Sequence, residues 1–149
     1  MTAVRQARSV PVTRFRILVV DDFAPWRHSV RSMLQGHLEL EVVGEVADGL
    51  EAVQKAEELH PDLILLDIGL PHLNGIEAAR RIRQSAPDTA ILFLTMNSDA
   101  DLVHAALDSH ANGYVLKADA GCEPLPAIQA VLRGKRYVSG GVAGRTSNN

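Results

Sequence analysis

Short apolar runs alternate along this chain with segments in which apolar residues recur at helical spacing. The first run, at residues 17–20, is wholly apolar and rich in β-branched residues, which is typical of a strand buried on both faces of a sheet. Similar runs follow at residues 40–46, 63–66, 90–94 and 114–116. Helical periodicity is centred on residues 30–34, 52–59 and 76–82, and it covers residues 99–109 and 123–133.

Five strand–helix units in alternation predict an α/β protein, because parallel strands need crossover connections and these are usually helices. We expect one five-stranded parallel sheet with helices on both faces, formed by residues 15–138. Residues 1–14 are expected to be a disordered arm. Residues 139–149, rich in Gly, Ser and Asn, are expected to be a flexible tail.

Composition and charge narrow the classes of function. The chain has 149 residues, of which 46% are hydrophobic and 22% charged, close to the average for globular proteins. A net charge of -3 argues against direct binding of nucleic acid. The longest apolar stretch is far shorter than the roughly 20 residues that span a bilayer. The single cysteine, Cys122, cannot form an internal disulfide. We therefore expect a cytoplasmic protein.

Charged and polar side chains stand where the predicted strands end. Asp21 and Asp22 follow the first strand, Asp67 the third, Thr95 the fourth and Lys117 the fifth. In an open parallel sheet, ligands bind outside the carboxyl ends of the strands. Three carboxylates, a hydroxyl and an ammonium group are therefore expected on one rim of the sheet.

This acidic group predicts a metal ion, because three carboxylates at close range repel one another unless a cation joins them. Hard oxygen ligands suit Mg²⁺, which keeps several waters and accepts phosphate oxygens. A carboxylate can then attack a phosphoryl group in line, while an ammonium and a hydroxyl neutralise the oxygens of the transferring group. Asp67 is the candidate nucleophile.

The residues resemble the receiver domains of bacterial-type response regulators from about Arg16 to Val138. The matching pieces are Ile17-Leu18-Val19-Val20-Asp21-Asp22, Asp67-Ile68-Gly69-Leu70-Pro71 with Asn74-Gly75, Thr95 after an apolar strand, and Gly113-Tyr114-Val115-Leu116-Lys117. Each piece alone is weak, but their order and spacing match together. The resemblance implies a flavodoxin-like, doubly wound fold and a phosphoacceptor rather than a conventional enzyme.

The resemblance also implies roles for the acidic residues. Asp67 would be the phosphorylated aspartate. Asp67 would also belong to the Mg²⁺ site, with Asp22 as a direct ligand, Asp21 acting mainly through metal-bound water, and the backbone carbonyl of Gly69, a contact that any residue type permits.

Three further residues receive roles from the same resemblance. Lys117 would pair with Asp67 and then with the phosphoryl oxygens, and Thr95 would swing inward to hydrogen-bond the phosphoryl group. Tyr114 would be the switch aromatic that turns inward with the threonine, although a tyrosine on a buried strand is often simply a core residue. The surface of the fourth helix, fifth strand and last helix would then change, and partners would read it.

Three positions carry local expectations. Ala118 stands where many receivers have proline after the lysine, so the backbone there is expected to differ. His110 stands where the family often has glycine, and it is a candidate for a backbone conformation uncommon outside glycine. Trp26, near the acidic pair, is a candidate for packing beside the site.

A sensor histidine kinase or a phosphotransfer protein is the partner that the resemblance implies. A homodimer, through the fourth-helix face or the first and last helices, is a hypothesis from the same source. Residues 117–120 and 133–139 look like those of receivers attached to LuxR-type helix-turn-helix domains. No such domain follows, so the chain is either part of a transcription regulator that reaches DNA through a missing output domain, or acts alone by protein contact.

The residues present disfavour two other classes of function. A haloacid-dehalogenase phosphohydrolase would need a second aspartate two residues after the nucleophile, where this chain has Gly69. A nucleotide-binding protein is also disfavoured, because neither a phosphate-binding loop nor a dinucleotide glycine motif follows the first strand. A receiver-like interaction module that takes no phosphate stays open as the alternative, although every charged site residue is present.

Overall fold

The computed structural model describes residues 14–96, 99–117 and 124–139. In chain order its elements are β1 (Phe15–Val20), α2 (Ala24–Leu34), β2 (Leu40–Val46), α3 (Gly49–Leu59), β3 (Leu63–Leu66), α4 (Gly75–Ser85), β4 (Ala90–Thr95), α5 (Ala100–Asp108), β5 (Gly113–Leu116), α6 (Pro124–Leu132) and β6 (Tyr137–Val138). The expectations for Ala118, Cys122, most of the arm and the tail beyond residue 139 lie outside the described residues.

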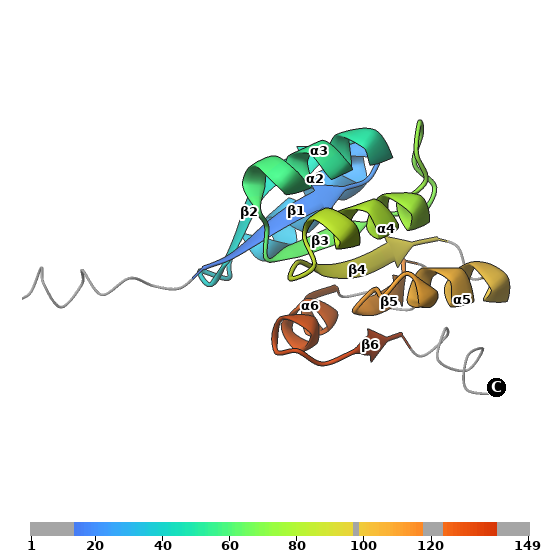
Figure 1. Cartoon of the computed structure of the whole chain (residues 1–149). Coiled ribbons are helices and arrows are strands. Elements are labelled where there is room, and N and C mark those ends of the chain that lie inside the picture. Colours follow the sequence, from blue (N-terminus) through green and yellow to red (C-terminus); the bar gives the residue numbers. More distant parts are fainter. Residues whose placement is uncertain (1–13, 97–98, 118–123, 140–149) are drawn as a thin grey trace, which may run out of the picture.

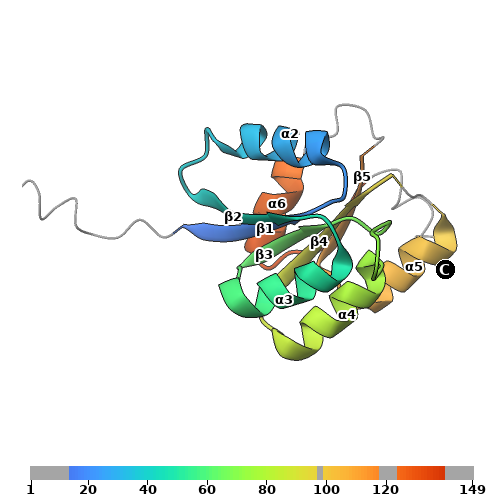
Figure 2. The same ribbon diagram turned by 90° about the horizontal axis from the view of Figure 1, so that it is seen from above.

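One parallel sheet runs through the middle of the domain, with strand order β2-β1-β3-β4-β5-β6. Helices α2 and α6 cover one face of this sheet, and α3, α4 and α5 cover the other (Figures 1 and 2). The predicted doubly wound fold is therefore confirmed, with its five strands in the order 2-1-3-4-5. The chain changes direction across the sheet after β2, so the switch point lies between β1 and β3.

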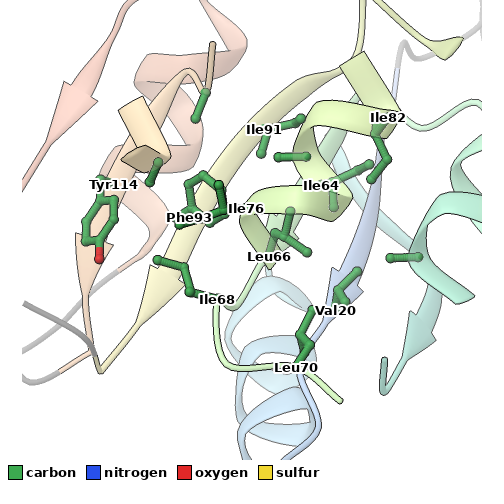
Figure 3. Packing of buried hydrophobic residues seen from close by; sticks show 14 of the residues in the cluster. Val20, Ile64, Leu66, Ile68, Leu70, Ile76, Ile82, Ile91, Phe93 and Tyr114 are labelled. Atoms are coloured by element: carbon green, nitrogen blue, oxygen red, sulfur yellow. The ribbon is translucent and has the colours of Figure 1, made fainter. Parts of the chain in front are cut away.

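The sheet separates two hydrophobic clusters. Leu18 and Val20 face the cluster under α3, α4 and α5, whereas Ile17 and Val19 face the cluster under α2 and α6. All four residues of β3 are buried, as expected for a central strand covered on both faces. Figure 3 shows the first cluster, in which Phe93 of β4 and Tyr114 of β5 lie next to each other. These rigid strands fix where their carboxyl ends point.

Three helices begin with a side-chain cap close to the carboxyl ends of the strands. Asp48 accepts a hydrogen bond from the backbone N–H of Glu51 at the start of α3. Asn74 caps α4 and Asp99 caps α5 in the same manner. Side-chain acceptors at these positions satisfy N–H groups that have no partner within the helix. They therefore determine at which residue each helix begins.

The sixth strand was not predicted, because two residues are too few to show a period. Tyr137 donates a backbone hydrogen bond to Asn112 O at 3.1 Å, and Ser139 donates one to Tyr114 O at 2.9 Å. The Ser139 hydroxyl accepts from the backbone N–H of Leu116 at 3.4 Å. Ser139, the first residue of the expected tail, is buried in the described structure, because these contacts hold it against β5.

His110 has a φ of 67°, which confirms the expected left-handed conformation. Arg83 of α4 binds the loop that contains His110. Its guanidinium donates to Pro87 O at 2.8 Å, to His110 O at 3.1 Å and to the Asn112 side chain at 3.2 Å. Arg83 therefore ties the end of α4 to the connection between α5 and β5.

We expect Arg83→Met to lower the free energy of unfolding by about 1–3 kcal/mol, because it leaves several carbonyl groups without their donor. Arg80→Met, on the same helix, is the matched control. Arg80 makes only an exposed ion pair with Glu77, so its loss should cost less than about 0.5 kcal/mol. Urea denaturation measures both variants. Equal losses would contradict the role given to Arg83.

Candidate phosphoacceptor site

The carboxyl ends of four strands deliver the predicted site residues to one rim. Asp21 follows β1 and is 2% exposed, and Thr95 ends β4 and is 1% exposed. Asp67 follows β3, and Lys117 follows β5. Asp22 is exposed at the edge of the group. The structure therefore brings together all five residues that the strand ends predicted.

The three aspartates form a compact acidic cluster. One carboxylate oxygen from each of Asp21, Asp22 and Asp67 lies within 4.8 Å of the other two. Carboxylate oxygens are the ligands that Mg²⁺ prefers, and exposed Asp22 leaves room for the waters that this ion keeps. The donor set therefore fits Mg²⁺. Gly69 lies on the loop after Asp67, and open space surrounds the position of its missing Cβ.

Lys117 supplies the positive charge of the site. Its ammonium forms an ion pair with Oδ2 of Asp21 and lies 3.8 Å from Oδ2 of Asp67. The side chain is only 9% exposed. The resemblance implied a pair with Asp67, but in this structure Asp21 is the nearer partner. A low-dielectric surrounding strengthens both contacts relative to water.

Trp26 lies beside this lysine, as the sequence suggested. The Lys117 ammonium sits over the Trp26 ring, 4.9 Å from its centroid. Trp26 belongs to the first turn of α2 and is partly buried against the α2–α6 cluster. A cation over an aromatic face is attracted by the ring quadrupole. The ammonium therefore has two carboxylates and one aromatic face around it.

The Asp67 carboxylate is strongly influenced by its surroundings. Burial raises the pKa of Asp67 above the ordinary value, and the nearby charge of Asp21 raises it further. Lys117, a hydrogen bond with Thr95 and one from the backbone N–H of Ile68 act in the opposite direction. The charged form of Asp67 is thus less favoured than in water, and added positive charge would favour it again.

The loop after Asp67 is anchored in the core. Ile68 and Leu70 are buried in the cluster under α3–α5 (Figure 3). The backbone N–H of Gly75 donates to Ile68 O at 2.8 Å, which folds the start of α4 back onto the loop after Asp67. A Cβ at Gly75 would lie 2.0 Å from the carbonyl oxygen of Asp67. Only glycine therefore fits this position without moving the Asp67 backbone.

Tyr114 is fully buried and is a core residue in this structure. Its ring centroid lies 6.0 Å from that of Phe93, with the planes tilted by 46°. Burial raises the pKa of Tyr114 to about 12, and the charges of Asp67 and Asp99 contribute. The phenol is therefore neutral at physiological pH.

Sequence reasoning missed Arg27, which supports the acidic rim from α2. Its Nη1 donates to the backbone oxygen of Asp21 at 2.6 Å, and its Nε lies 3.4 Å from Glu45 of β2. Arg31 donates to the same Glu45 at 2.6 Å. Nothing in the spacing of these residues pairs them, because their contact depends on β2 lying next to β1.

A doubly wound sheet with an acidic rim and a strand-end lysine defines a class of signalling domains, the receivers. A profile described as the response regulator receiver domain matches residues 17–122. The chain belongs to this family, whose members are phosphoacceptor signalling modules and not conventional enzymes.

The relatives and solved structures are regulators. The transcriptional regulatory protein DegU of Brevibacillus brevis is 35% identical over 125 residues, covering 84% of this chain and 53% of that protein. The response regulator protein VraR of Staphylococcus aureus is 37% identical over 120 residues, covering 80% and 57%. This chain thus spans little more than half the length of these two relatives.

Solved structures show the same likeness. A LuxR-family response regulator from Aurantimonas has a TM-score of 0.86 at 34% identity, covering 91% of this chain and 97% of that one. The isolated REC domain of RcsB from Salmonella enterica serovar Typhimurium, solved with the phosphomimetic BeF3−, has a TM-score of 0.83 at 25% identity, covering 89% and 99%.

We expect Gly75→Ala to lower the free energy of unfolding by about 1–3 kcal/mol, because the new methyl group overlaps the Asp67 carbonyl. Helix propensity alone would favour alanine at this position, so the sign of the effect is diagnostic. Gly69→Ala in the same loop meets open space and should change stability by less than about 0.5 kcal/mol. Thermal and urea denaturation would show whether the two variants differ in this way.

Proposed function

We propose that this chain accepts a phosphoryl group on Asp67 from a sensor histidine kinase or a phosphotransfer protein, as the receiver of a two-component system. One observation carries this proposal above the others. Asp67 stands on the rim between two further carboxylates and the Lys117 ammonium, with its Oδ2 3.8 Å from Nζ. A carboxylate nucleophile, oxygen ligands for a cation and a fixed positive charge are the parts that phosphoryl transfer needs.

The proposed transfer forms one bond and breaks one. A carboxylate oxygen of Asp67 attacks phosphorus, and the bond between phosphorus and the donor nitrogen breaks with its electron pair returning to the donor. Lys117 and Thr95 then bind the phosphoryl oxygens, Lys117 leaving Asp21 to do so. Both residues are nearly buried, so their contacts to the phosphoryl group are shielded from water.

Asp21, Asp22 and Asp67, together with the backbone carbonyl of Gly69, are the proposed Mg²⁺ ligands. The bound ion would supply positive charge that neutralises the carboxylates and the phosphoryl oxygens. The fit rests on three carboxylate oxygens within 4.8 Å of one another.

The proposed output is a change of the surface formed by α5, β5 and α6. Thr95 moves toward the phosphoryl group, and the Tyr114 ring turns inward into the space that Thr95 leaves. Transcription is the proposed process, through a DNA-binding domain in a longer protein, because relatives such as DegU are transcriptional regulatory proteins of greater length.

We also propose that the protein acts in the cytoplasm. Within the described ranges, no helix is long and apolar enough to cross a membrane.

We expect the protein to gain the mass of one phosphoryl group when it is incubated with acetyl phosphate and Mg²⁺. The gain should disappear in Asp67→Asn and without the metal, because the nucleophile or its neutralising charge is then missing. Intact-protein mass spectrometry measures the gain. Folded protein that binds Mg²⁺ but gains no mass from acetyl phosphate or a kinase, and does not bind beryllofluoride, would favour the phosphate-independent interaction module instead.

We also propose a homodimer, and we expect beryllofluoride with Mg²⁺ to raise the molecular mass in solution from one chain to two. The change of the α5–β5–α6 surface or of the α2 and α6 faces would create the contact. The structure of two RcsB dimers bound to DNA shows that one relative assembles as a dimer. Light scattering measures the mass, and a monomer in both states would refute the proposal.

A further inference from the structure

We infer that Trp26 is a positioning residue that confines the Lys117 ammonium inside the phosphoacceptor site. The inference deepens the proposed function and rests on it for the effect on phosphoryl binding. The Lys117 ammonium lies 4.9 Å from the centroid of the Trp26 ring, and the lysine side chain is 9% exposed.

The position of Trp26 is fixed by the start of α2. The backbone N–H of Trp26 donates to Phe23 O at 3.1 Å, and Pro25 occupies the first turn. Arg27 donates to the backbone oxygen of Asp21 at 2.6 Å, which ties this first turn to the end of β1. Trp26 also packs against the α2–α6 cluster. The ring is therefore held in place by contacts that do not involve the lysine.

Confinement matters because lysine has a long, flexible side chain. An ammonium at a strand end has many solvated conformations, and ordering it opposes any step that needs it at one place. Here the ammonium pairs with Asp21 and is 3.8 Å from Asp67, so it must change partner only over a short distance. The Trp26 face attracts the ammonium from another side and so limits the number of other conformations that the Lys117 side chain can adopt. The lysine is thus ordered before the phosphoryl group arrives.

The ring acts on the lysine and not on the metal ligands. A loss of the ring should therefore weaken the binding of a phosphoryl mimic while leaving the affinity for Mg²⁺ alone unchanged. A purely structural role would lower both affinities together, because the acidic cluster and the lysine share one rim.

The test uses the whole chain and three variants. Trp26→Leu removes the aromatic face, Trp26→Phe keeps one, and Phe23→Leu removes an exposed aromatic side chain three residues earlier. Calorimetry gives the dissociation constant of Mg²⁺ alone and of beryllofluoride in saturating Mg²⁺. For Trp26→Leu we expect beryllofluoride to bind about 3- to 10-fold more weakly and Mg²⁺ to bind within about twofold of wild type. Trp26→Phe and Phe23→Leu should match wild type closely.

A second measurement does not depend on phosphoryl binding. Acylation of lysines by an N-hydroxysuccinimide ester, followed by peptide mass spectrometry, reports how open each amine is. Lys117 should react about 3- to 10-fold faster in Trp26→Leu than in wild type, with Lys55 and Lys135 as internal references that do not change. Trp26→Phe should restore the slow reaction.

The outcomes separate the two proposals. If wild-type protein does not bind beryllofluoride, the proposed function fails, and the acylation rates alone decide whether Trp26 confines Lys117. Unchanged acylation of Lys117 in Trp26→Leu overturns the inference. An equal loss of Mg²⁺ and beryllofluoride affinity overturns it as well, because that pattern indicates general damage to the rim.

Discussion

The repulsion between three carboxylates on one rim is the constraint on which the rest of the structure depends. Asp21 is almost completely buried, and no apolar surrounding would hold such a charge unless cations balanced it. Lys117 balances it from β5, and the guanidinium of Arg27 binds its backbone oxygen from α2. The strand order brings the ends of β1, β3 and β5 together. The sheet therefore holds the three carboxylates close to one another despite their repulsion.

The scaffold resists that repulsion because the strands carrying the charges are rigid. β1 and β3 are paired along four residues and are apolar on both faces. The loop after Asp67 cannot yield either, since Ile68 and Leu70 anchor it in the core and Gly75 closes against the Asp67 carbonyl. Among the described residues of the site, the Lys117 side chain is the part that can change partner, because its ammonium pairs with Asp21 and lies 3.8 Å from Asp67.

Most of the fold and the rim followed from the sequence, because strand ends are local signals and the parallel sheet brings them together. Asp21, Asp22, Asp67, Thr95 and Lys117 were all placed in this way. The choice of Asp21 as the nearer partner of Lys117 did not follow, since it depends on side-chain conformation. Nor did the support from Arg27, which depends on contacts between α2 and β2. The strand β6 was too short to give a period.

The two borders of the sheet differ in a way that bears on association of the chain with itself. An open strand border is a template for unwanted pairing with another strand. On one side β6 covers β5 with only two residues, which is too short for such a template. On the other side β2 is seven residues long, but it carries Glu41 and Glu45 and an irregularity in its register opposite Ile17 and Leu18. Both borders are therefore poor starting points for aggregation.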